Sequence, residues 1–198
     1  MSFLKLLLIG LAMTTLTACS KTVQWEEEVP LNTGDVIRVK REVVYKLQGT
    51  GGNPLDLGYW PSWTEEIAFE WKGKKYKYVG DADLMLLAIS PTTQRPVLVA
   101  KAANKQWSRQ NNYRCTTPFY VQFVPSSDGR EWSWPPSIEP WLYNMPRNLM
   151  AKREGFAKMN AQARYTTNDR VALDTTMAIQ NPSNARIDPS YKFDSCFK

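Results

Sequence analysis

The sequence predicts a mainly β fold, an antiparallel β-sandwich or barrel of about seven strands with one α-helix in its C-terminal half. Apolar and polar residues alternate along residues 35–48 and 170–180, which is the period of a strand with one buried face. In the first of these segments Arg41 interrupts the apolar positions. Breaker residues separate the apolar runs at short intervals, and no strand alternates with a helical segment as βαβ units require.

The remaining strands are expected between these two segments. Residues 49–54 contain Gly, Asn and Pro and end the first strand, and an aromatic loop follows at 55–63. Residues 66–79 alternate around Gly73, which predicts a hairpin with its turn at that glycine. Residues 84–89 are apolar throughout, which predicts a strand buried on both faces, with a short helix as the alternative for a run of this length. Further strands are predicted at 97–100 and at 119–123.

A helical pattern follows a loop-like stretch, residues 126–146, that is rich in Trp and Pro. Pro146 suits the first turn of a helix, where the missing N–H costs no hydrogen bond. An apolar stripe on one face would bury this helix against the sheets. We therefore expect an α-helix from Pro146 to about Arg164, with the stripe formed by Leu149, Met150, Phe156, Met159 and Ala163.

The first 18 residues have the layout of a secretory signal: one Lys, a short apolar run and small residues before a cleavage site. Leu16-Thr17-Ala18-Cys19 resembles the lipobox of bacterial lipoproteins. The resemblance implies that the Cys19 thiol receives a diacylglycerol and that a signal peptidase cuts before Cys19. We expect a signal peptide at 1–18, a tether at 19–33 and a single β-rich domain at 34–198.

The resemblance to lipoproteins also implies a location. Ser20 stands where an Asp would retain an enterobacterial lipoprotein at the inner membrane, so an outer-membrane anchor facing the periplasm is implied. Residues 25–31 (WEEEVPL) and 63–66 (WTEE) are similar to small lipoproteins of Gram-negative bacteria and their prophages. That group has no assigned activity, and the similarity implies a non-enzymatic envelope role.

The formal net charge of +6 is unevenly distributed along the chain. Residues 20–90 hold 9 basic and 11 acidic side chains, whereas residues 91–164 hold 11 basic and 4 acidic ones. A basic middle segment can face an anionic lipid, a glycan or a nucleic acid, but no compact Lys/Arg run is present. We therefore expect a solvated surface and no nucleic-acid partner.

Cys115 and Cys196 are the cysteines that remain once Cys19 is lipidated. An exported protein folds in an oxidising compartment, where two remaining cysteines are expected to pair. A disulfide between them would close a loop of about 80 residues and stabilise the fold by roughly 4–5 kcal/mol in the chain-entropy model.

The chain contains no histidine, which excludes Ser-His and Cys-His nucleophilic catalysis and any metal site that needs an imidazole. Asp81 and Asp83, with Asp56, are the nearest approach to the paired carboxylates of a glycosidase. Aspartates in an expected turn more commonly stabilise the turn itself. We therefore predict no catalytic activity, no cofactor and no metal, and we rank a carboxylate-based glycosidase last.

Tryptophans outside the expected strands are the candidate ligand-binding residues. A loop Trp can stack on a sugar ring or anchor a partner protein, and it can also seal the open end of a sandwich. Our hypothesis is a lipid-anchored, non-catalytic protein that binds another envelope component, with a glycan- or peptidoglycan-binding module as the alternative. The candidates are Trp60, Trp63, Trp132, Trp134 and Trp141.

Replacing Cys19 with Ala is expected to abolish labelling by a clickable palmitate analogue and to release the protein from membranes. The longest apolar run after Cys19 covers residues 84–89, far below the roughly 20 residues that span a bilayer. In a high-salt wash of membranes, the wild-type protein should stay bound because acyl anchoring survives salt. A Cys19→Ala protein that remains bound after the wash would contradict the lipoprotein prediction.

Overall fold

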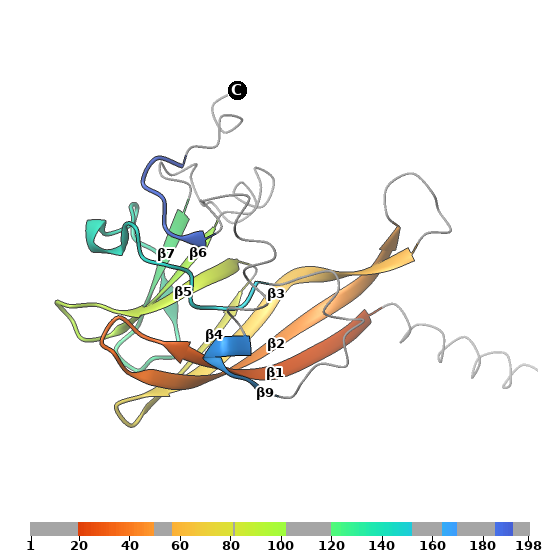
Figure 1. The fold of residues 1–198 in the computed structure, drawn as a ribbon, viewed down its shortest axis with the longest axis horizontal. Coiled ribbons are helices and arrows are strands. Elements are labelled where there is room, and N and C mark those ends of the chain that lie inside the picture. The colour runs from red at the N-terminus through yellow and green to blue at the C-terminus, as the bar shows by residue number, and fades with distance from the viewer. Residues whose placement is uncertain are drawn as a thin grey trace, which may run out of the picture.

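A computed structural model describes residues 20–49, 57–80, 82–101, 120–151, 164–169 and 185–191. These residues form nine strands in two facing sheets, and the sheets are not closed into a barrel (Figure 1). The prediction of a mainly β sandwich is therefore confirmed. Within the same residues, no helix is long and apolar enough to cross a membrane.

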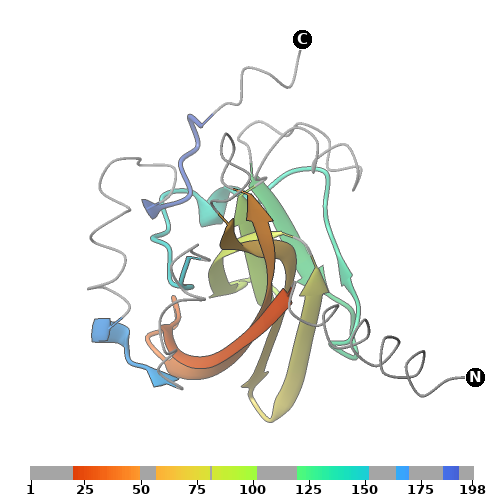
Figure 2. The same cartoon turned by 90° about the vertical axis from the view of Figure 1, so that its right-hand side faces the viewer.

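The first sheet has the strand order β4-β3-β2-β1-β9, and the second has the order β5-β6-β7-β8. Neighbouring strands are antiparallel except β1 and β9, which are parallel. β1 curves strongly along its length (Figure 2). The strands are β1 (Ser20–Pro30), β2 (Val36–Gly49), β3 (Leu57–Trp71), β4 (Lys74–Gly80), β5 (Asp83–Ile89), β6 (Pro96–Lys101), β7 (Tyr120–Pro125), β8 (Trp132–Ser133) and β9 (Arg164–Tyr165); a short 3-10 helix, η2, covers Pro140–Leu142.

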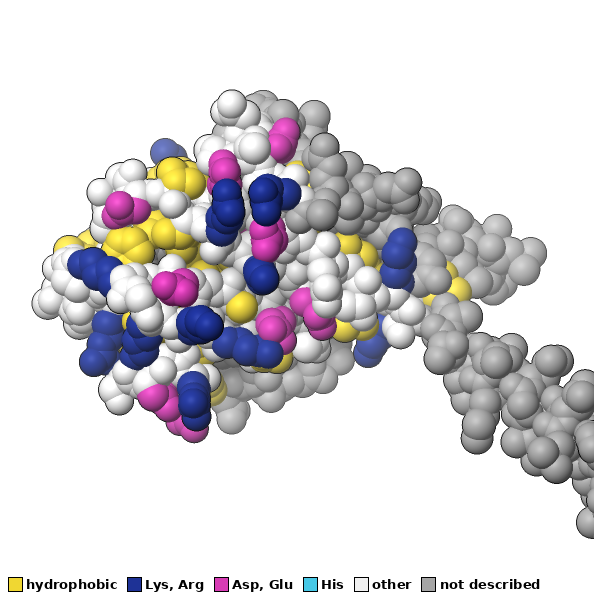
Figure 3. Space-filling model, turned by 90° about the horizontal axis from the view of Figure 1, so that it is seen from below, with side chains coloured by type: hydrophobic (Ala, Val, Ile, Leu, Met, Phe, Trp, Pro, Cys, Tyr) yellow, Lys and Arg dark blue, Asp and Glu magenta, His cyan; other side chains and the backbone are white. Residues whose placement is uncertain are grey.

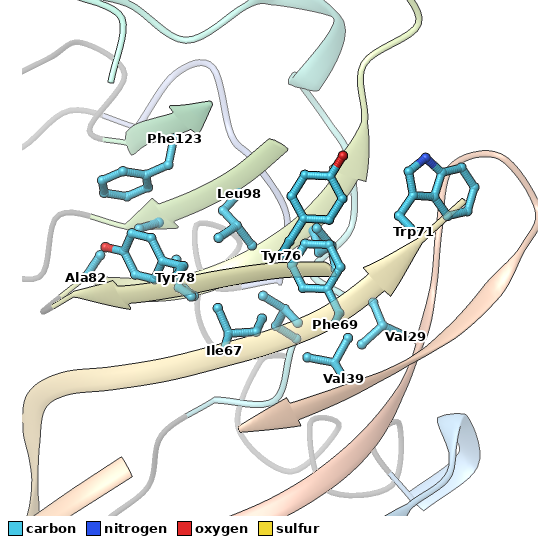
Figure 4. Packing of buried hydrophobic residues seen from close by; sticks show 14 of the residues in the cluster. Val29, Val39, Ile67, Phe69, Trp71, Tyr76, Tyr78, Ala82, Leu98 and Phe123 are labelled. Carbon is cyan, nitrogen blue, oxygen red and sulfur yellow. The ribbon is translucent and has the colours of Figure 1, made fainter. Parts of the chain in front are cut away.

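The main hydrophobic core lies between the two sheets (Figure 4). The inward residues of the first sheet, such as Ile67 and Phe69, meet residues of the second sheet, such as Leu98 and Phe123. Six of the seven residues of β5 are buried, which confirms that residues 84–89 are covered on both faces. A second cluster covers the other face of β5 and β6 with side chains that include Ile138 and Leu142.

Two asparagine side chains form hydrogen bonds with backbone groups at the open edge of β5. Asn148 accepts the N–H of Leu87 at 2.8 Å and donates to the carbonyls of Leu87 and Pro30 at 2.7 and 2.8 Å. Asn32 accepts the N–H of Ile89 at 2.7 Å and donates to its carbonyl at 2.8 Å. Each amide thus replaces one residue of a missing neighbouring strand, and the Pro30 contact links β5 to the first sheet.

The expectation of a tether at 19–33 is wrong for residues 20–30, which form β1. This strand pairs with β2 along its whole length, and Val23, Trp25 and Val29 are buried. A run of three glutamates, Glu26 to Glu28, suits a solvated segment, but in an extended strand these side chains point to alternate faces. Of the three, only Glu27 faces inward, where it forms an ion pair with Arg41.

The loop predicted at residues 55–63 is also corrected, because residues 57–63 belong to β3. The β2–β3 register shifts between Val43, which pairs with Glu65, and Tyr45, which pairs with Pro61. Pro61 lacks an N–H, and prolines within sheets occur at such irregularities. The Pro and aromatic residues that indicated a loop therefore mark a bulge in a long strand.

The predicted helix does not begin at Pro146. Residues 146–151 are irregular, and Pro146 forms an isolated antiparallel bridge with Arg186. Arg164 lies in β9, where it pairs with Glu26. Tertiary contacts determine the conformation of this segment, because the Asn148 side chain and the backbone N–H groups of residues 148 and 149 form hydrogen bonds with β5. Residues 152–163 and the predicted strand at 170–180 lie outside the described residues.

A buried charge triad crosses the three central strands of the first sheet. The guanidinium of Arg41 (β2) donates from Nη1 to Glu27 Oε1 (β1) at 2.6 Å and from Nη2 to Glu65 Oε1 (β3) at 2.7 Å. None of the three side chains is exposed. The ring of Trp25 lies 5.2 Å from the guanidinium carbon, and Glu27 Oε2 accepts the N–H of Met150 at 2.9 Å.

Burial and attraction oppose each other in this triad. Burial raises the pKa of Glu27, although the charge of Arg41 counteracts it. For Arg41, burial alone would lower the guanidinium pKa, but the two carboxylates outweigh it and raise that pKa. The charges therefore depend on one another, and removal of the cation leaves two carboxylates in an apolar interior.

Replacing Arg41 with Met is expected to lower the free energy of unfolding by about 3–5 kcal/mol, because the buried carboxylates lose their counter-ion. The neighbouring substitution Lys40→Met is the control, since the Lys40 side chain is 75% exposed on the opposite face and should change stability by less than about 0.5 kcal/mol. Urea denaturation of both variants measures the difference. Equal midpoints for the two variants would contradict the role of the triad.

Candidate functional site

A surface groove of about 1650 Å³ lies along the edge strand β4. One side is formed by residues of β2, β3 and β4, and the other by the loop between β7 and β8 together with Trp132 and Trp134. The face of the first sheet carries interspersed cationic and anionic side chains (Figure 3). In the groove, however, the lining includes six cations and three carboxylates. The cations are Arg38, Lys40, Lys74, Lys75, Lys77 and Arg130, and the carboxylates are Glu26, Glu70 and Asp128.

The β3–β4 hairpin positions the cations of β4. Lys72 and Gly73 form its turn with φ angles of 49° and 75°, so both have the left-handed conformation of a two-residue type I′ turn. This confirms the predicted turn at Gly73. The register places Lys75 opposite Glu70 and Lys77 opposite Ala68 on the outer face. The small side chain of Ala68 leaves room for the groove between its larger neighbours.

The loop between β7 and β8 is attached to the outer edge of β4. The indole N–H of Trp132 donates to the carbonyl of Lys77 at 2.7 Å, and the ammonium of Lys74 donates to the carbonyl of Ser127. Gly129 has a φ of 79°, and a Cβ at this position would lie 3.0 Å from the Tyr76 ring. A glycine is therefore required for the loop to approach β4 this closely.

Asp128 is the carboxylate at the tip of this loop. Its Oδ1 accepts the hydroxyl of Ser126 at 2.5 Å and the backbone N–H of Arg130 at 3.1 Å. These hydrogen bonds, the Ser126 one foremost, lower the pKa of Asp128 below its ordinary value. Asp128 therefore remains ionised in the groove at neutral pH and can accept hydrogen bonds there through Oδ2.

The groove cations differ in how far they are already paired. Lys77 forms a 2.8 Å ion pair with Glu66, and Lys40 forms a 3.6 Å ion pair with Glu26. Within the described ranges, four groove cations form no ion pair. Lys74 donates to the Ser127 carbonyl, and the other three are Arg38, Lys75 and Arg130. These three can neutralise an anionic ligand without first breaking an internal ion pair.

The structure separates the predicted tryptophans. Trp132 packs against the core, with its ring 5.8 Å from the Tyr78 ring in an edge contact, whereas Trp134 is 47% exposed in the groove. Trp141 packs against the second cluster, donates to the Glu139 carboxylate and does not line the groove. Trp60 and Trp63 lie in β3, and their side chains are outside the described part.

Most of the groove cations lie outside the segment whose composition predicted a basic surface. The basic excess was expected in residues 91–164, but among the described basic residues of that range only Arg130 lines the groove. Arg164 instead forms a 3.4 Å ion pair with Glu26. The run Lys72-Gly73-Lys74-Lys75-Tyr76-Lys77 was the available signal, because alternation around a two-residue turn places Lys75 and Lys77 on one face.

The remaining predicted site residues are the aspartates and the cysteines, and most of them lie outside the described residues. Asp83 begins β5 and lies 4.0 Å from Arg147, while Asp56 and Asp81 are outside the described residues. The described ranges contain no group of three or more His, Cys, Asp or Glu side chains that could hold a metal ion. The lipidation site Cys19 and the predicted disulfide partners Cys115 and Cys196 also fall outside these ranges, so both modifications stay predictions.

Comparison with known protein families, with curated protein sequences and with solved structures gives no match for this chain. Its function must therefore be argued from the groove and from the residues around it.

Replacing Trp132 with Phe is expected to lower the free energy of unfolding by about 1 kcal/mol, because the indole hydrogen bond to β4 is lost. The matched substitution Trp134→Phe alters a side chain that is 47% exposed and should change stability by less than about 0.5 kcal/mol. Urea midpoints of the two variants test this contrast. A larger loss for Trp134→Phe would show that Trp134, and not Trp132, attaches the loop.

Proposed function

We propose that this chain is a lipid-anchored, non-catalytic cell-envelope protein that binds another envelope component through the β4 groove. The observation that carries the proposal is an open groove in which cations outnumber carboxylates two to one beside a half-exposed tryptophan. Trp and Arg are the residue types that contribute most to binding interfaces. The cation excess would steer an anionic partner toward this surface.

The size of the groove supports a large or extended partner. Pockets for small molecules have volumes of about 300–1,000 Å³, and this groove, at about 1650 Å³, exceeds them. The Asp128 carboxylate also suits the acceptance of hydrogen bonds better than general acid catalysis. A general acid needs a raised pKa, whereas the pKa of Asp128 is lowered.

The anchor and the groove would lie at different ends of the first sheet. β1 begins at Ser20, one residue after the predicted lipidation site, and it runs toward Pro30 without a flexible spacer. In the register of β1 and β2, Glu26 lies opposite Lys40 and Glu28 lies opposite Arg38, and these two cations are the ones that β2 contributes to the groove. These pairs lie six to eight residues from Ser20, which is about 20–26 Å along a strand.

A photo-crosslinking residue tests the binding surface in intact cells. At Val79, which is 58% exposed and lines the groove, ultraviolet light should yield a discrete adduct of higher mass. At Lys46, exposed at the other end of β2, the same residue should give no such adduct. Equal adducts at both positions, or none at Val79, would contradict the groove as the binding site.

A further inference from the structure

We infer that the ligand of the β4 groove is an anionic polysaccharide, lying along the cations of β2 and β4 with a sugar ring on Trp134. This inference rests on the proposed function and names the ligand class of the same site. Three observations carry it: the spacing of the cations, the mixture of groups between them, and the distance from the predicted anchor.

The cations form two short rows. Arg38 and Lys40 are two positions apart on the outer face of β2, and Lys75 and Lys77 are two positions apart on the outer face of β4. The two residues of each row are therefore about 6.7 Å apart along the strand. Arg130 lines the same groove from the β7–β8 loop. Such spacing suits a polymer that presents acidic groups repeatedly along its length.

The other groups of the groove favour sugars over other polyanions. Asp128 keeps one carboxylate oxygen without a hydrogen bond among the described residues, and Glu70 also lines the groove. These carboxylates repel the acidic groups of any polyanion. Between its acidic groups a polysaccharide also presents many hydroxyls, which can donate hydrogen bonds to the two carboxylates. Trp134 is 47% exposed in the groove, and an indole ring can pack against the C–H face of a pyranose.

The distance from the predicted anchor argues against the lipid headgroups of the same membrane. The β2 cations lie about 20–26 Å along the sheet from Ser20, and electrostatic attraction is screened within about 8 Å at physiological salt. For a domain standing on its anchor, the groove would lie beyond the range of the headgroup charges. A polymer in the surrounding compartment can reach it there.

The test measures binding of the full-length protein in detergent to polygalacturonate, a carboxylated polysaccharide. Dextran, polyglutamate, oligo-dT and phosphatidylglycerol vesicles serve as competing probes. We expect binding to polygalacturonate that Lys75→Ala/Arg130→Ala weakens about tenfold and Trp134→Ala weakens several-fold. The control Lys46→Ala/Arg186→Ala removes two exposed cations outside the groove and should leave binding within about twofold of wild type.

The remaining outcomes overturn the inference in distinguishable ways. Dextran that binds as well as polygalacturonate would show a neutral-glycan site. Polyglutamate, oligo-dT or vesicles that bind as well as polygalacturonate, with no effect of Trp134→Ala, would show unspecific attraction of anions. Absence of polygalacturonate binding, while the Val79 adduct persists in cells, would overturn the ligand class and leave the proposed function standing. Loss of both would overturn the two together.

Discussion

The position of Arg41 between Glu27 and Glu65 is the constraint on which the rest of the first sheet depends. The three side chains come from three adjacent strands and all face the apolar interior, so each charge is tolerable only where the others lie within hydrogen-bond distance. A slip of two residues that placed Arg41 opposite Val23 would keep the inward residues of β1 and β2 inward, but it would leave Glu27 buried without its cation. The triad therefore selects one register for β1, β2 and β3 among the several that the hydrophobic pattern alone would permit.

The groove follows from that register. Once alternate residues of β2 and β3 are fixed inward, Arg38 and Lys40 must point outward, and Ala68 must lie between them and the lysines of β4. The β3–β4 turn continues the alternation, because its two left-handed residues match the twist of the paired strands. A buried group of mixed charge thus determines where the cations gather on the opposite, solvated face of the same sheet.

The two sheets are joined at their edges by side chains rather than by strand pairing. At one edge Asn148 links β5 to the end of β1, and at the other Trp132 links the β7–β8 loop to β4. Such links satisfy the backbone groups of edge strands that would otherwise invite pairing with another chain. At the β4 edge they have a second consequence, since they hold Arg130 and Trp134 beside the lysines. The attachment of the loop and the composition of the groove are therefore one structural feature.

The sequence by itself determined the β class, the turn at Gly73 and the two-sided burial of residues 84–89, because period and turn chemistry are local properties. It also marked Arg41 as an exception to its strand, although it could not supply the partners, which lie 14 and 24 residues away. Only the tertiary structure decided that residues 20–30 form a strand, that residues 146–151 serve β5 instead of beginning a helix, and that Trp132 is structural while Trp134 is exposed. Each of these depends on which distant segment lies alongside, and contacts between distant segments leave no periodic signal in either one.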